Sequence, residues 1–233
     1  MKPGRILALL FLLTAGGLAA ALALGLVRVP PAWDPFAPLD VKAPPNLVTG
    51  LKLWRLEHDG GACFAALESS EMDYRRLPDR RVGDGCDLID TVRVQEAGVS
   101  FNRSFVATCP LAVSFAMFAR HALQPAAERH FGRGVTRVEH LGSFACRNVY
   151  GRERGRRSQH ATANALDVSA FILSDGRRIA VVSGWSGGTA LQTFLRNVRD
   201  GACRFFDAVL SPDYNAAHRD HFHLDRGSFR ACR

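Results

Sequence analysis

Lysine is scarce in this sequence. Of its 30 basic residues only Lys2, Lys42 and Lys52 are lysines, although the chain carries a formal net charge of +8. The positive charge is therefore mostly arginine, whose planar guanidinium binds carboxylates and phosphates through paired hydrogen bonds. A GC-rich genome also produces an arginine-rich protein, so the charge alone identifies no partner. No nucleic-acid recognition motif accompanies it, and we expect no nucleic-acid partner.

Internal repeats and a second linker are also absent, which excludes a repeat array and favours a single domain. The length of 233 residues is enough for one domain with a buried core. With 47% apolar and 22% charged residues, the composition is typical of a globular protein and argues against a disordered chain.

None of the six cysteines belongs to a CxxC pair, which argues against a cysteine-ligated zinc site. An even number of cysteines in an exported domain favours disulfides instead. Several connectivities are possible, and we expect neighbours in sequence to pair. The expected disulfides are Cys63–Cys86, Cys109–Cys146 and Cys203–Cys232.

The N-terminal segment predicts export. Two basic residues precede an uncharged run from Ile6 to Val27, and about 20 apolar residues suffice to cross a bilayer. Residues 1–28 therefore predict an uncleaved signal anchor, with the N-terminus in the cytoplasm and the rest at the periplasmic face of the inner membrane. A cleaved signal peptide is the alternative interpretation, because Ala21–Ala23 resembles a cleavage site. The protein would then be periplasmic or secreted.

Proline is concentrated just after this segment, with six prolines between Pro30 and Pro45. Proline fixes φ and removes a backbone donor, so residues 29–45 predict an extended tether. The folded domain is then expected over residues 46–233.

Apolar spacing within the domain alternates between helical and strand periods. Pro125 is expected to kink the first long helix, and Asp175–Gly176 favours a hairpin turn. The pattern predicts an α+β fold, a small antiparallel sheet flanked by helices. The expected elements are a helix over 109–132, a strand over 134–146, a hairpin over 165–185, a helix within 187–210 and a strand over 221–225.

Histidines gather in "NAAHRDHFHLD", residues 215–225, which holds three of the eight in the chain. Alternate residues of a strand share a face, so His221 and His223 should point the same way. Two imidazoles are half of a metal site, because zinc takes three or four protein ligands. Without a metal, the same segment is a polar strand end.

"SQHATANALD", residues 158–167, supplies further candidate ligands. On one continuous strand His160 and Asp167 would face opposite sides. They converge only if His160 lies on a loop that bends into the strand, which the small residues at 161–164 permit. Asp167 lies among apolar residues, where an unpaired carboxylate is costly and a bound cation removes the cost.

"SQHATANALD" resembles the Ser-x-His-x-x-Gly-x-Ala-x-Asp motif of the zinc D-Ala-D-Ala metallopeptidases. That group shares a superfamily with lysostaphin-type peptidases and the hedgehog amino-terminal domain. Ser158, His160, Ala165 and Asp167 match, and Ala163 stands where the motif has glycine. "DHFH", ending at residue 223, resembles the second motif, an acidic residue three positions before a ligand histidine. It also resembles the His-x-His of other branches.

More closely, the chain resembles the bacterial extensin-like C-terminal domain family over roughly residues 46–233. The agreement lies in "GACFAALE", "GSFACR", "SQHATANALDVSAF" and "HRDHFHLD". The Ser-Pro repeats of plant extensins are absent, so the family name implies no such function here.

These resemblances imply a hedgehog-like and D-Ala-D-Ala-peptidase-like fold and one zinc ion held by His160, Asp167 and His223. Water would complete the tetrahedron, although other first-row ions bind the same ligands. Two residues are candidates for the general base. Asp220 matches the acidic position of the peptidases, whereas His221 has the better strand geometry. We favour Asp220 as the base, with His221 stabilising the oxyanion.

"GSFACR" stands in the place of the peptidases' Ser-Gly-Tyr-Arg segment, which implies that Arg147 binds a substrate carboxylate. Arginines over 147–157 would attract acidic cell-wall polymers such as peptidoglycan. We expect an exported zinc peptidase or amidase that acts on peptidoglycan stem or cross-link peptides. The alternatives are a non-catalytic, zinc-stabilised wall-binding module and a metal-free polysaccharide-binding domain.

Overall fold

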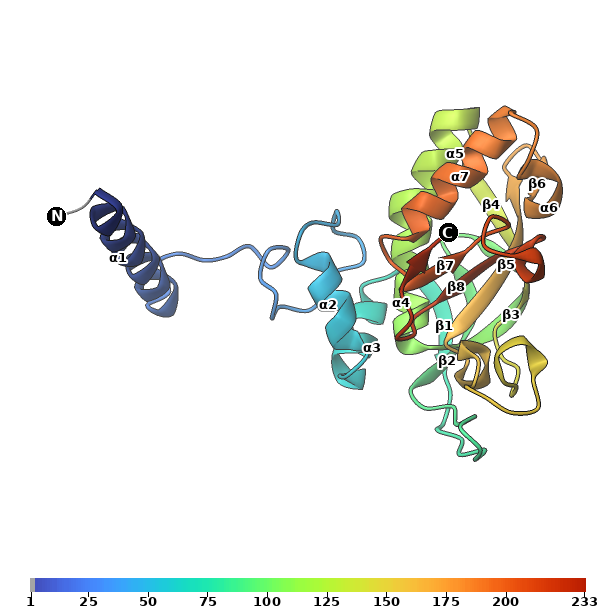
Figure 1. The fold of residues 1–233 in the computed structure, drawn as a ribbon, viewed down its shortest axis with the longest axis horizontal. Coiled ribbons are helices and arrows are strands. Elements are labelled where there is room, and N and C mark those ends of the chain that lie inside the picture. The colour runs from blue at the N-terminus through green and yellow to red at the C-terminus, as the bar shows by residue number, and fades with distance from the viewer. Residues whose placement is uncertain (1–2) are drawn as a thin grey trace.

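The body of the molecule is a mixed β-sheet against which helices pack (Figure 1). The structure, a computed structural model, describes residues 3–233. Met1 and Lys2, which belong to the predicted signal segment, lie outside the described residues. The strands are β1 (Met72–Arg76), β2 (Thr91–Ala97), β3 (Ser100–Thr108), β4 (Val135–Gly142), β5 (Ala165–Leu173), β6 (Arg178–Ala180), β7 (Ala208–Leu210), β8 (Phe222–Asp225) and β9 (Ala231–Cys232).

Helices precede, interrupt and follow these strands. The α-helices are α1 (Pro3–Ala23), α2 (Thr49–Leu56), α3 (Gly60–Glu68), α4 (Cys109–Phe118), α5 (Gln124–Phe131), α6 (Val181–Gly184) and α7 (Ala190–Ala202). A π-helical segment, η1 (Ala119–Leu123), joins α4 to α5. The short 3₁₀ segments are η2 (Val149–Gly151), η3 (Gln159–Thr162) and η4 (Ala216–His218).

The α+β class is confirmed, but the prediction of a small antiparallel sheet is wrong. Over the described residues the sheet has nine strands in the order β1-β2-β3-β4-β5-β8-β7-β9, with β6 paired to β5. Pairs β3–β4 and β7–β9 are parallel. The first parallel pair arises because α4, η1 and α5 cross over between its two strands, and β3 and β4 then meet side by side.

The long helical pattern after Cys109 is divided as Pro125 predicts. Thr108 caps α4, accepting a hydrogen bond from the backbone N–H of Leu111. The π-helical segment η1 comes directly before α5, which carries Pro125 in its first turn. Proline lacks a donor and crowds the preceding turn, so the change of helical pitch there has a local cause. Gly132 ends α5 at a φ of 61°.

The segment predicted as a tether lies against α2. Lys52 Nζ donates to the carbonyl of Pro31 at 2.7 Å, and Arg55 Nη1 donates to the carbonyl of Pro35 at 2.7 Å. Leu39 and Val41 are buried in the core. The packed body therefore includes part of residues 29–45. Among residues 3–233, no helix is both long and apolar enough to cross a membrane.

Three disulfides staple the fold. They are Cys63–Cys109, Cys86–Cys146 and Cys203–Cys232. The last confirms the prediction, whereas the expected pairs Cys63–Cys86 and Cys109–Cys146 are wrong. Because α3 packs on α4, Cys63 meets the first residue of α4, with a Cα–Cα distance of 6.0 Å. The loop between β1 and β2 instead reaches the segment after β4.

Candidate metal centre

Two of the candidate ligands are a cross-strand pair. Strands β5 and β8 are antiparallel neighbours, and their register places Asp167 directly opposite His223. Residues opposite each other in such a pair have side chains about 4.5–5.5 Å apart at Cβ. Strand pairing therefore brings together two residues that are 56 positions apart in the sequence.

The third candidate ligand, His160, reaches the pair through a tight turn. Ser158 accepts a hydrogen bond from the backbone N–H of His160 at the start of η3. Ala163 then ends η3 in the left-handed conformation, at φ 56° and ψ 31°, before β5 begins. This is the position where the peptidase motif has glycine, a residue that adopts positive φ without strain. The predicted bend between His160 and Asp167 is present.

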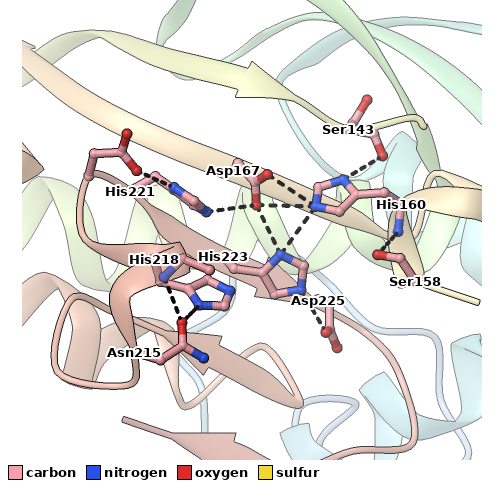
Figure 2. A network of polar contacts seen from close by, with 11 residues as sticks. Ser143, Ser158, His160, Asp167, Asn215, His218, His221, His223 and Asp225 are labelled. Carbon is pink, nitrogen blue, oxygen red and sulfur yellow. Dashed lines mark hydrogen bonds and ion pairs between the residues drawn. The ribbon is translucent and has the colours of Figure 1, made fainter. Parts of the chain in front are cut away.

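The donor atoms of the three residues lie close together (Figure 2). Nε2 of His160 is 3.1 Å from Oδ2 of Asp167 and 3.2 Å from Nδ1 of His223. Nδ1 of His223 is 2.9 Å from Oδ1 of Asp167. Both histidines are almost fully buried, with exposed fractions of 4% for the residue His160 and 9% for the residue His223.

The outer hydrogen bonds of both imidazoles fix which nitrogen faces the centre. Nδ1 of His160 lies 3.1 Å from the carbonyl oxygen of Ser143, which can only accept, so this nitrogen carries the proton. Nε2 of His223 donates to Oδ2 of Asp225 at 2.9 Å. When both rings are neutral, Nε2 of His160 and Nδ1 of His223 therefore carry no proton. Their lone pairs point at each other and at Asp167.

This donor set fits a tetrahedral metal ion. Lone pairs and a carboxylate that face one another repel unless a cation or a proton lies between them. Ligands bound at zinc distances of about 2.0–2.1 Å in tetrahedral geometry are about 3.3 Å apart. The observed 2.9–3.2 Å separations are close to that value. Residues that hold the far nitrogen of a metal-binding histidine are usual at such sites.

Without a cation the cluster binds a proton instead. Burial acts to lower the pKa of His223, but the hydrogen bonds and charges of Asp167 and Asp225 outweigh it and raise that pKa to about 9. Burial also acts to raise the pKa of Asp167, but hydrogen bonds from His160 and His223 hold it well below its usual range. The pocket thus favours a bound positive charge in both states, a metal ion in one and a proton in the other.

The ligand group opens into a cavity of about 370 Å³. Arginines come from the segment between β4 and η3, and aromatic side chains lie at the rim. Arg147, predicted to bind substrate, lines this cavity, and its side chain is exposed. Besides the ligand group, the lining includes Arg147, Tyr150, Arg156, Arg157, Tyr214, His218, His221 and Phe229.

The two candidate general bases occupy different places. His221 precedes β8 and lines the cavity, with Nε2 3.6 Å from Oδ1 of Asp167. Asp220 lies behind it, and its Oδ1 is 2.8 Å from Nδ1 of His221. That hydrogen bond holds the pKa of Asp220 below its usual range. His221 is therefore the member of the pair adjacent to the ligand group.

Sequence reasoning assigned no role to His218, which lies in the cavity wall. Its Nδ1 is 2.8 Å from Oδ1 of Asn215, and the amide of Asn215 donates to the hydroxyl of Tyr150 at 3.0 Å. Burial, together with nearby His223 and His221, lowers the pKa of His218 to about 4. The imidazole of His218 is thus neutral. Its orientation is fixed by Asn215, which links it to Tyr150 across the cavity mouth. Only its spacing from His221 in "HRDH" could have indicated this.

The fold and the site together define an α+β protein, stapled by disulfides, with a two-histidine, one-aspartate cluster at the floor of an arginine-lined cavity. Residues 61–233 match the family model described as extensin-like protein C-terminus. Because the match covers most of the chain, the protein belongs to this family, as its motifs predicted. No curated protein and no solved structure matches the chain.

Proposed function

We propose that the protein is an exported zinc-dependent hydrolase, a peptidase or amidase, that acts on peptidoglycan stem or cross-link peptides. The observation that carries this proposal is the convergence of His160, Asp167 and His223, with both tautomers set by Ser143 and Asp225. Three protein ligands leave a fourth position open, as catalytic zinc sites do. The motif resemblance to zinc D-Ala-D-Ala peptidases, and a fold related to theirs, are part of the proposal.

A bound zinc ion would polarise a scissile carbonyl and lower the pKa of a water molecule toward about 7. Residues of the protein would transfer the proton next to this ion. His221 holds its Nδ1 proton toward Asp220, so Nε2 can accept a proton beside the ligand group. The Asp220 carboxylate then stabilises the imidazolium. This geometry favours His221 as the base, with Asp220 orienting it.

The charge of the cavity suits an anionic substrate. Arg147 and Arg156 line it with exposed side chains, whereas Arg157 donates to the carbonyl of Asp84. Stem peptides carry free carboxylates, which a guanidinium binds through two hydrogen bonds. We propose that Arg147 binds such a carboxylate and that the residues of 147–157 attract the polymer electrostatically.

A second candidate is a non-catalytic, zinc-stabilised wall-binding module. The observation in its favour is the position of Asp220, whose side chain is 45% exposed and hydrogen-bonded to His221. The peptidase motif assigns the base to this acidic position, yet the carboxylate lies outside the cavity lining. Such a module would keep the metal and bind peptidoglycan without cleaving it.

The proposal places the domain outside the cytoplasm. Segment 1–28 would hold it at the periplasmic face of the inner membrane, or release it if cleaved. The three disulfides are stable in such an oxidising compartment.

Elemental analysis of the full-length, disulfide-intact protein is the first test. We expect about one zinc per chain, retained in His58→Ala and lost in a folded His160→Ala, His223→Ala variant. Purified peptidoglycan fragments would then be incubated with the wild type and with His221→Ala. Cleavage lost with zinc retained supports the hydrolase. Binding without cleavage by the wild type supports the module, and an absence of zinc after reconstitution rejects both.

A further inference from the structure

An apolar ridge runs along the outer side of α2. Leu47 precedes the helix, and Leu51 and Trp54, three positions apart on it, lie on one face. Their exposed fractions are 92%, 47% and 47%. Leu53 and Leu56, on the opposite side of α2, are buried in the core. These three exposed residues form the α2 ridge.

Basic side chains border the α2 ridge on one flank. Trp54 lines a shallow cavity of about 410 Å³ together with Arg204 and Arg230. Both arginines are exposed. The nearby carboxylates of Glu57 and Asp207 are already paired with the buried Arg226. With three arginines and two carboxylates, this flank is positive.

Aromatic residues extend the exposed apolar surface toward the N-terminus. Trp33 and Phe36 are 51% and 79% exposed. Arg55, on α2, holds this segment by donating to Pro35 and stacks on Phe36 at 5.6 Å. Lys52 is buried, and its Nζ donates to the carbonyls of Pro31 and Pro38. Exposed apolar residues therefore lie both on α2 and on the chain that leads to α1.

We propose that the α2 ridge lies in the headgroup region of an anionic phospholipid bilayer. Tryptophan is enriched at membrane interfaces. Helices that lie there bury leucine and tryptophan and keep basic residues at the polar edge. The place of the α2 ridge in the chain, shortly after the apolar run from Ile6 to Val27, favours lipid over a protein partner.

This contact would orient the candidate metal centre. In Figure 1 α1 lies at one end of the long axis, and α2 lies between it and the sheet. The yellow segment that contains η2 and η3 lies toward the other end. With α2 on the lipid, the segments η2 and η3, whose residues line the arginine-lined cavity, would lie on the side of the body away from the bilayer. The proposal is independent of zinc binding and of hydrolysis.

Tryptophan quenching in vesicles tests the contact. The full-length protein would be reconstituted in phosphatidylcholine–phosphatidylglycerol vesicles that contain brominated lipid. The variants are Trp33→Phe, Trp54→Phe and the double variant, which keeps only the buried Trp185 as an internal control. We expect quenching of the wild type, loss of most of it in Trp54→Phe, and none in the double variant.

The charge contribution is tested with Arg204→Gln, Arg230→Gln. Quenching of Trp54 should grow with the fraction of phosphatidylglycerol in the wild type and stay constant in this variant. If Trp54→Phe leaves the quenching unchanged, Trp54 does not touch lipid and the proposal is wrong. Self-association through Trp54 in detergent, with no quenching in vesicles, would instead assign the ridge to a protein partner and also overturn it.

Discussion

Two buried polar clusters meet at the end of β8, one around Arg226 and one around Asp167. Arg226 is 8% exposed, with Nη1 3.2 Å from Oδ2 of Asp207 and Nη2 in contact with Glu57. Its charge is matched by carboxylates, and it also donates to the carbonyls of Phe205 and Leu53. The counter-charges of this cluster are all protein groups.

The Asp167 cluster has no permanent counter-charge of this kind. Asp167 and Asp225 bring two negative charges, and the neutral imidazoles of His160 and His223 bring lone pairs. No arginine or lysine of residues 3–233 forms an ion pair with either carboxylate. In the metal-free protein a proton on His223 completes the second cluster, and under the proposed function a bound cation takes its place.

Loss of the ligand imidazoles should have the largest effect, because it removes zinc binding by the Asp167 cluster and leaves the Arg226 cluster intact. The His160→Ala, His223→Ala variant should bind zinc more than about 100-fold more weakly than the wild type, beyond the cost of losing an outer hydrogen bond. Competition with a fluorescent zinc chelator measures this. Equal affinity in the two proteins would place the metal elsewhere.

Removing the guanidinium from the balanced cluster should affect stability instead. Arg226→Met removes the closer guanidinium from Asp207, which keeps only Arg230 at 3.4 Å, and leaves the partly exposed Glu57 unpaired. It should lower the free energy of unfolding by about 3 kcal/mol, the lower end for a broken buried pair. Urea denaturation of the metal-free protein measures this. The exposed Arg230→Ala should change it by less than about 0.5 kcal/mol. If zinc affinity fell with Arg226→Met, the two clusters would be coupled.

Zinc itself should stabilise the folded protein only by binding to the Asp167 cluster. At a free concentration of 100 times Kd, zinc should raise the free energy of unfolding by about 2.7 kcal/mol. A chelator should reverse the rise in Tm. The gain should persist in Arg226→Met and be absent from the double histidine variant. A gain of equal size in the latter would show nonspecific binding.

The smallest expected effect is at the residue that joins the two clusters. Asp225→Asn keeps an oxygen for the backbone N–H of Gly227 but no longer holds the Nε2 proton of His223 electrostatically. Zinc affinity should fall by about 10–100-fold. Asp200→Asn, an exposed carboxylate beside Arg199, is the matched control and should leave the affinity unchanged.

Much of the candidate centre could be predicted from local patterns. Strand alternation placed His221 and His223 toward one cavity, and the small residues before Ala165 indicated the bend that returns His160 to Asp167. Asp167 was conspicuous as a carboxylate in an apolar strand. These signals each lie within a few residues of the ligand concerned.

The extent of the sheet and two disulfides depend on contacts between distant segments. Strands β6, β7 and β9 have three residues or fewer, too short for a periodic pattern. The parallel pairing of β3 with β4 depends on how three helical segments cross over. Likewise, Tyr150 takes a φ of 57° at the cavity mouth, a conformation that its residue type does not suggest.

The disulfide Cys86–Cys146 links folding to the redox state of the compartment. It anchors the segment after β4, where the carbonyl of Ser143 holds the proton of His160 and the N–H of Ala145 donates to the carbonyl of His160. A reduced chain lacks this restraint on one ligand. Oxidation should therefore precede high-affinity metal loading, and a newly made polypeptide in a reducing cytosol would hold zinc poorly. Maturation of the centre would then be confined to the oxidising side of the membrane.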